Sequence, residues 1–572
     1  MRSSLKLSIG QYSDKGCKPT NQDFHGALVP KEPQLSMKGA AVVLADGISS
    51  SDVSQVASET AVKGFLLDYF CTSDAWSVQH SVERVLHATN SWLLSQTQKS
   101  QYRFDTDRGY VCTFSGIVFK AAVAHLFHVG DSRIYRLHSN ALEQLTNDHR
   151  LYVSQEESYL SRAMGMTPEL GLDYRAVPVK AGDLFLLATD GVYEYLDAVQ
   201  VLNALEQHEG LDDAARVLVE QALAKGSDDN LTLQLVRVDQ LPSANVPGLQ
   251  QQIEELPFAP ELDARMQFDG YEILRELHRT SRSHVFLAQD LETDERVVIK
   301  LPSVDLRGDT EYLERFLLEE WVARRINSAH VLKAPTQVRP RNYIYTVAEY
   351  IEGQTLKQWL VDNANPSLET VRGIIEQVAK GLQGFHRKEM LHQDLKPDNI
   401  MIDSNGTVKI IDFGSTQVAG LDEIMRTEEV GGILGTALYT APEYFLGELG
   451  SVRSDQFSLG VLTYYMLSGR FPYSTAVAKA KTPAAQRRLS YESVRDDHSE
   501  IPAWVDEALK KAVHLNPYKR YDEISEFIYA LRQPSQAFLS RTRPPLMERN
   551  PVAFWQGVSL VLAIIIVMLL ER

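Results

Sequence analysis

Cysteine is scarce in this chain of 572 residues, which has three: Cys17, Cys71 and Cys112. Their spacing matches no zinc-ligand pattern, and so few thiols cannot form the disulfide framework of a small secreted domain. We therefore expect a protein that works in a reducing cytosol and has no structural zinc site.

Positive charge is also in deficit, because 58 Lys and Arg residues stand against 75 Asp and Glu residues, a formal net charge of −17. Such an acidic chain is a poor partner for nucleic acid, and we expect no nucleic-acid binding. The apolar share of 44% and the charged share of 23% are ordinary for globular proteins, which excludes a disordered or collagen-like chain.

A continuous apolar run is lacking at the N-terminus, where MRSSLKLSIGQYSDK contains no hydrophobic region of a secretory signal. Charge is lacking instead in residues 552–570, an apolar stretch whose helix would span about 28 Å. The preceding Arg532, Arg541, Arg543 and Arg549 favour a cytoplasmic position for the flank. We expect a single-pass C-terminal tail anchor in a cell inner membrane, with the rest of the chain cytoplasmic. The alternative is a buried C-terminal helix.

Proline-rich segments divide the chain, since residues 240–267 and 534–551 each contain four prolines. Such segments are typical of linkers. We therefore expect a first domain, a linker, a second domain, a basic juxtamembrane linker and a transmembrane helix. The corresponding ranges are 1–239, 240–267, 268–533, 534–551 and 552–570.

In the first domain, three apolar runs that resemble buried strands stop at an aspartate. AAVVLADG ends at Asp46 and Gly47, AHLFHVGDS reaches Asp131, LFLLATDG reaches Asp190, and Asp229 precedes another strand. A single Asp–Gly pair is usually an ordinary turn. Clustered carboxylates, however, repel one another unless a cation neutralises them. Mg²⁺ and Mn²⁺ prefer such oxygen ligands, and two of these ions can share a water and hold a phosphoryl group.

Seven segments of this domain together resemble the metal-dependent serine/threonine protein phosphatase family, type 2C. They are KPTNQDF (18–24), ADGIS (45–49), HVGDSRIY (128–135), LTNDH (145–149), LSRAMG (160–165), LLATDGVY (186–193) and SDDNLT (227–232). The resemblance covers about residues 5–238. It implies an αββα sandwich, in which two antiparallel β-sheets have helices outside, and a site for two or three Mg²⁺ or Mn²⁺ ions.

The resemblance also implies a role for each carboxylate. Asp46 would bridge two ions, with help from the Gly47 carbonyl. Asp190 and Asp229 would complete the site of the first ion. Asp131 and Asp190 would hold a looser third ion.

Three departures from the family pattern bear on activity. Lys18 stands where the family has a phosphate-binding arginine, and it keeps the charge without the bidentate fork. Gln22 replaces the usual glutamate, which weakens the expected second ion, and Ile48 cannot act as an acid. We expect an active but slower phosphatase.

No cysteine is followed by an arginine six positions later, so a cysteinyl-phosphate mechanism is excluded.

The second domain contains HQDLKPDN followed by KIIDFG, the most specific pattern in the chain. Phosphoryl transfer needs positioned metal ions and a base near the acceptor hydroxyl. Asp394 can be that base, and Lys396 can meet the phosphate. Asn399 and Asp412 can bind Mg²⁺. Residues 268–532 resemble bacterial eukaryotic-like serine/threonine protein kinases, which implies a bilobal fold and Mg-ATP as cofactor.

Other positions of the second domain agree with this resemblance. Lys300 ends the strand VVIK and would reach the nucleotide phosphates, and Glu319 would be its partner on the following helix. TVAEYIEG, which includes Glu349, resembles the hinge that receives adenine, and Val285 stands at the valine after the phosphate-covering loop. The residues that match supporting positions of the fold are Glu443, Asp455 and Arg520.

Two departures bear on kinase activity. His278, Thr280 and Ser283 occupy the three glycine positions of the phosphate-covering loop, so the backbone can approach the phosphates less closely. Gln393 replaces the arginine that commonly receives a loop phosphate. We therefore expect that loop phosphorylation is not the on-switch. The threonines concerned are Thr416, Thr427 and Thr436.

Together these features predict a bifunctional, membrane-tethered signalling enzyme in which a kinase and an opposing phosphatase share one chain. Its expected partners are proteins with Ser/Thr or phospho-Ser/Thr, the chain itself among the candidates. The alternative is an active phosphatase joined to a pseudokinase that binds nucleotide. The glycine-poor loop favours this alternative, and the complete set of six catalytic positions disfavours it. A scaffold with two inactive domains would lack those positions.

Overall fold

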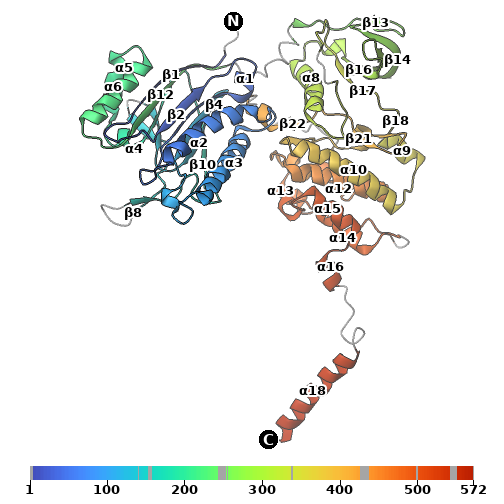
Figure 1. The fold of residues 1–572 in the computed structure, drawn as a ribbon. Helices are drawn as coiled ribbons and strands as arrows, with labels where there is room; N and C mark the ends of the chain where they lie inside the picture. The colour runs from blue at the N-terminus through green and yellow to red at the C-terminus, as the bar shows by residue number, and fades with distance from the viewer. Residues whose placement is uncertain are drawn as a thin grey trace.

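The computed structural model describes residues 4–138, 141–152, 158–242, 253, 255–335, 339–424, 437–496, 500–541 and 551–570. Parts of both predicted linkers, together with Thr427 and Thr436, lie outside these residues. Figure 1 shows two bodies side by side and a separate C-terminal helix.

The N-terminal body contains two five-stranded sheets in which all neighbouring strands are antiparallel. The order of the first sheet is β1 (Lys6–Asp14), β12 (Leu231–Gln240), β11 (Leu184–Ala188), β6 (Arg133–His138) and β7 (Ala141–Gln144). The order of the second is β10 (Asp173–Pro178), β5 (Val123–Val129), β4 (Phe114–Lys120), β3 (Ala40–Ala45) and β2 (Phe24–Leu28). The first strand of the body therefore pairs with its last.

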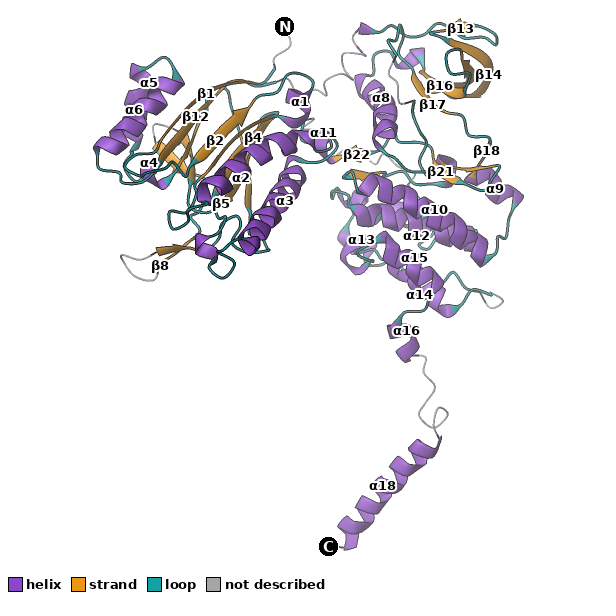
Figure 2. Cartoon of the chain, in the orientation of Figure 1, coloured by secondary structure: helices purple, strands orange, loops and turns teal. Residues whose placement is uncertain are grey.

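Helices cover the outer faces of both sheets (Figure 2). The second sheet carries α2 (Ser54–Asp68) and α3 (Val78–Lys99), and the first carries α5 (Ala198–Gln207) and α6 (Leu211–Ala224). Shorter elements are α1 (Gln34–Lys38), η1 (Tyr69–Cys71), η2 (Thr106–Arg108), β8 (Arg150–Tyr152), β9 (Ser158–Leu160) and α4 (Asp190–Tyr193).

Strand β3, with the sequence AAVVLA, shows how this body is held together. All six of its side chains are buried. Val42 and Leu44 belong to the apolar cluster between the sheets, whereas Val43 packs in the cluster beneath α2 and α3. A strand covered on both faces needs a continuous apolar run rather than an alternating one. The expected αββα sandwich is confirmed.

The C-terminal body has a small lobe built on one antiparallel sheet. Its strands are β13 (Gln267–Phe268), β14 (Tyr271–Arg279), β15 (Ser283–Asp290), β16 (Arg296–Pro302) and β17 (Thr346–Glu349). Helix α8 (Thr310–Arg325) packs beside this sheet.

The larger lobe is mainly helical. Its helices are α9 (Leu356–Asp362), α10 (Leu368–His386), α11 (Ala419–Asp422), α12 (Val452–Ser468), α13 (Pro483–Gln486), α14 (Ala503–Ala512), α15 (Ile524–Arg532) and α16 (Gln536–Arg541). Short strands are β18 (Gly353–Thr355), β19 (Met390–Leu391), β20 (Ile400–Asp403), β21 (Val408–Ile410) and β22 (Gln417–Val418). The 3₁₀ turns of the body are η3 (Val304–Leu306), η4 (Pro397–Asn399), η5 (Pro442–Leu446), η6 (Val477–Lys479) and η7 (Pro517–Lys519). The expected two-lobed architecture is confirmed.

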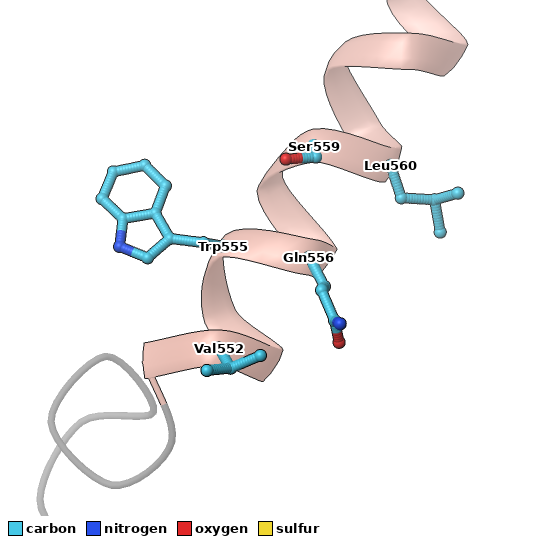
Figure 3. Close-up of a pocket in the computed structure, with 5 residues that line it drawn as sticks. All are labelled: Val552, Trp555, Gln556, Ser559 and Leu560. Atoms are coloured by element: carbon cyan, nitrogen blue, oxygen red, sulfur yellow. The ribbon is translucent and has the colours of Figure 1, made fainter.

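Helix α18 (Pro551–Leu570) lies apart from both bodies in Figure 1. Figure 3 shows a hollow along its side, lined by Val552, Trp555, Gln556, Ser559 and Leu560. This hollow lies on one helix, far from the candidate catalytic residues, and carries no functional inference. Among the residues that the structure describes, no helix is both long enough and apolar enough to cross a bilayer. The predicted transmembrane anchor is therefore not supported by the structure and stays a prediction.

A buried ion pair joins two distant segments of the larger lobe. The Arg520 guanidinium donates to both carboxylate oxygens of Glu443, over 2.8 and 2.7 Å. The two side chains are 0% and 3% exposed. Removing one partner of such a pair leaves an uncompensated buried charge.

We predict that Glu443→Ala lowers the free energy of unfolding of the C-terminal domain by about 3–5 kcal/mol. Thermal unfolding of the full chain, followed by calorimetry, measures this effect on the C-terminal transition. The matched control is Arg532→Ala, which removes an arginine that is 41% exposed and paired at the surface, and it should leave the transition in place. Equal shifts in the two variants would contradict the prediction.

Candidate active sites

The loop between β19 and β20 brings three of the predicted catalytic residues together. Lys396 Nζ donates to Asp394 Oδ2 over 2.6 Å. Asn399 Nδ2 donates to the same oxygen over 3.0 Å and to the Asp394 carbonyl over 2.8 Å. These bonds hold the Asp394 carboxylate in one orientation, as a base in phosphoryl transfer requires.

A buried aspartate beneath this loop sets the loop's shape. Asp455 accepts hydrogen bonds from the backbone N–H groups of His392 and Gln393, over 2.9 and 3.0 Å, and His386 Nε2 lies 2.8 Å from the same carboxylate. Burial alone would raise the pKa of Asp455, but the bond to His386, the two nearby histidines and the Gln393 N–H hold it below its ordinary value. Gln393 has a φ of 66°, and the bond to Asp455 stabilises this left-handed backbone.

The predicted pair of Lys300 and Glu319 is formed in the structure. Lys300 Nζ on β16 donates to both carboxylate oxygens of Glu319 on α8, over 2.8 and 2.7 Å. Burial lowers the pKa of Lys300, but the negative charges of Glu319 and Asp412 outweigh burial and hold the pKa above its ordinary value. The ammonium group is therefore charged and fixed against α8.

Asp412 follows β21 and Ile411, and its Oδ1 accepts a hydrogen bond from Gly414 N over 3.0 Å. Burial would raise the pKa of Asp412, but Lys300 and the Gly414 N–H hold it below its ordinary value. Ile411 N donates to the Asn399 carbonyl over 3.0 Å, so the two predicted Mg²⁺ ligands stand on adjoining segments.

The predicted phosphate-covering loop is a tight hairpin between β14 and β15. Thr280 N donates to the Ser283 carbonyl over 2.9 Å, and Ser283 N donates to Thr280 Oγ1 over 3.0 Å. The hydroxyl of Tyr312, on α8, donates to the Arg282 carbonyl over 2.5 Å. The loop without glycines is therefore closed by its own side chains and rests on α8.

The two other predicted nucleotide contacts lie on the small sheet. Val285 on β15 stands opposite Lys300 on β16. Glu349 ends β17, where its carboxylate accepts from Lys333 N over 2.8 Å and from Lys409 Nζ over 2.7 Å. Since these two lysines already occupy the carboxylate, any contact of Glu349 with adenine would have to be made by its backbone. Both assignments stay predictions.

In the N-terminal domain, the predicted metal ligands converge from four strand ends. Asp46 and Gly47 follow β3, Asp131 follows β5, Asp190 follows β11, and Asp229 precedes β12. Burial, together with the negative charges of the neighbouring aspartates, raises the pKa of Asp46 well above its ordinary value. Burial and the same repulsion raise the pKa of Asp190 to about 7. The cluster therefore has an excess of negative charge.

Asp23 is a member of this cluster that the sequence analysis missed. Thr189 and Thr232 donate to its Oδ2 over 3.0 and 2.7 Å, whereas Oδ1 is buried with no hydrogen-bond partner. Burial raises its pKa to about 6. An unsatisfied carboxylate oxygen beside four other carboxylates fits a site for a hard cation. The feature of the sequence that could have indicated Asp23 is its position directly after Gln22, within KPTNQDF.

Two basic side chains contact the cluster. Lys18 Nζ lies 3.3 Å from Asp229 Oδ1, and its predicted role in binding the substrate phosphate stays a prediction. Arg150 was not foreseen, and its guanidinium lies 2.5 Å from Asp131 Oδ2 and 2.9 Å from Asp190 Oδ2. Arg150 therefore neutralises the pair that the sequence assigned to a looser third ion.

Gln22, a second departure from the family pattern, uses its amide nitrogen in bonds to neighbouring serines. Gln22 Nε2 donates to the Ser51 carbonyl and to Ser54 Oγ, both over 2.7 Å. Within the described ranges, no three His, Cys, Asp or Glu side chains stand close enough together to hold a metal ion. The donor chemistry fits Mg²⁺ or Mn²⁺, and binding would require Lys18 and Arg150 to release part of their contacts.

Two separate stretches of the chain match known protein families. Residues 18–236 match the family described as Protein phosphatase 2C, and residues 271–529 match the family described as Protein kinase domain. The chain therefore contains a phosphatase domain followed by a kinase domain. The two expected enzyme classes are confirmed at the level of these domains.

Curated relatives match the kinase domain. Serine/threonine-protein kinase PrkC of Bacillus subtilis is 30% identical over 260 residues, which are 44% of this chain and 38% of PrkC. Serine/threonine-protein kinase PknL of Mycobacterium tuberculosis is 31% identical over 264 residues, which are 46% of this chain and 64% of PknL. The chain thus spans less than two thirds of the length of these relatives.

Solved structures match each domain separately. The serine/threonine phosphatase PstP/Ppp of Mycobacterium tuberculosis has 24% identity and a TM-score of 0.35, and the match covers 41% of this chain and 99% of that one. The PknI kinase domain of the same organism has 23% identity and a TM-score of 0.37, with 48% of this chain and 99% of that one covered.

We predict that Mn²⁺ stabilises the phosphatase domain against heat, by about 2–3 kcal/mol when Mn²⁺ is present at ~100 times its dissociation constant. When a chelator removes metal ions, Asp190 of the folded domain stays protonated up to a pH of about 7, whereas Asp190 of the unfolded chain loses its proton at lower pH. Metal-free stability should therefore fall as pH rises from the ordinary carboxyl range towards neutrality. The gain from Mn²⁺ should grow over the same interval, because protons compete less.

Calorimetry of the full chain, with chelator or Mn²⁺ at several pH values, measures this prediction. Asp190→Asn should remove most of the Mn²⁺ gain, whereas the surface variant Asp213→Asn should keep it. A gain that is the same in both variants, or that shrinks as pH rises, would show the prediction to be wrong.

Proposed function

We propose that the chain is a bifunctional signalling enzyme. Its kinase domain phosphorylates Ser or Thr in proteins with Mg-ATP, and its phosphatase domain hydrolyses phosphoserine and phosphothreonine with water activated by two metal ions. The observation that carries the proposal is the closed set of contacts that joins Lys300 to Glu319 and Asp394 to Lys396 and Asn399.

In the kinase domain, Asp394 takes the proton of the attacking hydroxyl. Lys396 lies 2.6 Å from Asp394 Oδ2 and offsets negative charge on the transferred phosphoryl group. Lys300, oriented by Glu319, binds the nucleotide phosphates. Mg²⁺, when held by Asn399 and Asp412, supplies further neutralisation of phosphate charge.

In the phosphatase domain, Asp46, the Gly47 carbonyl, Asp190 and Asp229 would hold the metal ions. Bound Mg²⁺ or Mn²⁺ supplies the Lewis acidity that activates water and neutralises phosphate. Lys18 then binds the substrate phosphate as a point charge. Arg150 offsets the charge of Asp131 and Asp190 in the place of a third ion, which supports two ions rather than three.

A second candidate function has a specific observation in its favour. The phosphate-covering loop has side chains at its three glycine positions and is bonded to Tyr312 of α8. A loop held in this way favours a domain that binds nucleotide without transferring phosphate. The paired Lys300 and the oriented Asp394 favour transfer instead, because nucleotide binding alone needs no base.

We predict that full-length Asp190→Asn, incubated with Mg-ATP, gains phosphate that intact-mass spectrometry detects. The Asp190 substitution prevents the chain from removing its own phosphate. Adding Asp394→Asn should slow the gain by about 10²–10⁴-fold, because the base is lost. No gain in the single variant, with added protein substrates also unmodified, would favour the nucleotide-binding alternative.

The tail anchor remains part of the proposal. Its support is the uncharged stretch of residues 552–570 and the exposure of its apolar side chains, which include Val552, Trp555, Leu560 and Ile564. Exposed apolar surface of this kind favours burial in lipid or against a partner.

We predict that the full chain, expressed in bacteria, stays in the membrane pellet after carbonate extraction. Leu560→Arg with Ile564→Arg should release it, because each arginine costs about 2.5–3.5 kcal/mol at the centre of a membrane helix. Leu560→Ile with Ile564→Leu is the matched control and should stay in the pellet. Release of the unaltered chain would disprove the anchor.

A further inference from the structure

The two domains touch through a face of the phosphatase domain that consists of residues 74–78 and Lys120, here called the docking face. Residues 74–78 lead into α3, and Lys120 ends β4. The kinase residues in contact are 387–389, before β19, and 420–423, in and after α11. Figure 2 places α11 beside the N-terminal domain.

The N-terminus of α3 binds two carboxylates of the kinase domain. Ser77 N and Ser77 Oγ donate to Glu389 Oε2 over 2.8 and 2.9 Å. Val78 N donates to Glu423 Oε1 over 2.9 Å. The first N–H groups of a helix lack partners within the helix and carry partial positive charge, so bonds to carboxylates are strengthened there.

Lys120 also binds the kinase segment that contains Glu423. Its Nζ donates to the Gly420 carbonyl over 2.6 Å and to Glu423 Oε2 over 2.9 Å. The Lys120 side chain is 1% exposed. A lysine this deeply buried depends on its carboxylate partner, which in this case belongs to the other domain.

The fit around Gly420 is close. Gly420 N donates to the Ala75 carbonyl over 2.9 Å. A Cβ on Gly420 would lie 2.5 Å from the Asp74 carbonyl oxygen and 2.8 Å from that of Trp76, so a larger residue does not fit. Ala75 also packs in the same apolar cluster as Leu421 of the kinase domain.

The docked kinase segment is connected to the catalytic loop. β22, which precedes α11, pairs with β19, which precedes the catalytic loop. Gln393 Nε2 donates to Gln417 Oε1 over 2.8 Å, and Gln417 Nε2 donates to Asp422 Oδ2 over 2.7 Å. A chain of hydrogen bonds therefore runs from the residue before Asp394 to Asp422 in the docked α11. Thr416, beside β22, is buried.

The docking face also contacts the helix that carries Glu319. Arg325, the last residue of α8, lies 3.2 Å from Asp74 Oδ2. Its guanidinium stacks 3.6 Å from the ring centroid of Trp321 on the same helix. One face of the phosphatase domain thus reaches the end of α8, the segment before the catalytic loop and the segment after Asp412.

We propose that the docked phosphatase domain activates the kinase domain by ordering residues 417–423 and the end of α8, independently of phosphate hydrolysis. The inference rests on the proposed kinase activity. Lys120 and the N-terminus of α3 supply the positive charge that fixes the carboxylates of Glu423 and Glu389. Gln393 joins the ordered segment to the catalytic loop without a loop phosphate.

The test compares full-length Lys120→Glu with its parent, both carrying Asp190→Asn so that hydrolysis cannot hide the product. Initial rates with dephosphorylated casein should show kcat lowered about tenfold and the KM for ATP nearly unchanged. Amide hydrogen exchange in residues 417–423 should become faster. The charge swap Lys120→Glu with Glu423→Lys should recover most of the rate.

Hydrolysis of p-nitrophenyl phosphate by Lys120→Glu in the chain with native Asp190 shows whether the phosphatase domain is still folded. If that activity is lost, Glu423→Lys in the kinase domain is the second variant, with the same expectations. Unchanged rates and exchange, or a faster kinase, would overturn the inference while the proposed function stands. A parent without kinase activity would overturn the proposed function and the inference with it.

Discussion

A buried carboxylate needs positive charge or hydrogen-bond donors nearby, and the arrangement of both domains depends on that requirement. In the kinase domain the partners come from the chain itself. Lys300 joins the sheet to α8 through Glu319, Arg520 joins two segments of the larger lobe through Glu443, and Asp455 holds the catalytic loop. Since each partner is distant in sequence, satisfying a charge also ties separate segments together.

The phosphatase domain meets the same requirement only in part. Lys18 and Arg150 reach three of its clustered carboxylates, but Asp23 keeps a buried oxygen without a partner, and the pKa of Asp46 stays well above its ordinary value. One domain therefore pairs its buried carboxylates with its own basic side chains and N–H groups, whereas the other leaves part of its carboxylate cluster unpaired.

Local motifs predicted the two sites because their spacing fixes the loop geometry. HQDLKPDN places Asp394, Lys396 and Asn399 in one short loop, so their contacts follow from the sequence. The resemblance of the seven segments implied the sandwich, whereas apolar runs such as that of β3 predicted only its buried strands. Arg150 was missed because only the tertiary fold brings it to Asp131 and Asp190.

The contact between the domains could not be predicted from the sequence for the same reason, since Lys120, Ser77 and Gly420 belong to no recognisable motif. Their significance depends on which surfaces meet. The predicted anchor is a different case, because its apolar pattern is plain in the sequence, yet among the described residues no helix meets the requirements of a membrane span.

The docking face belongs to the same chain as the segment that it binds, so dilution leaves the docked fraction unchanged. Ionic strength acts differently on its two charge pairs. Arg325 and Asp74 are 28% and 41% exposed, so dissolved ions screen their attraction, whereas burial shields the Lys120 pair from such screening. The contact therefore responds to the ionic composition of the surroundings rather than to the abundance of the protein.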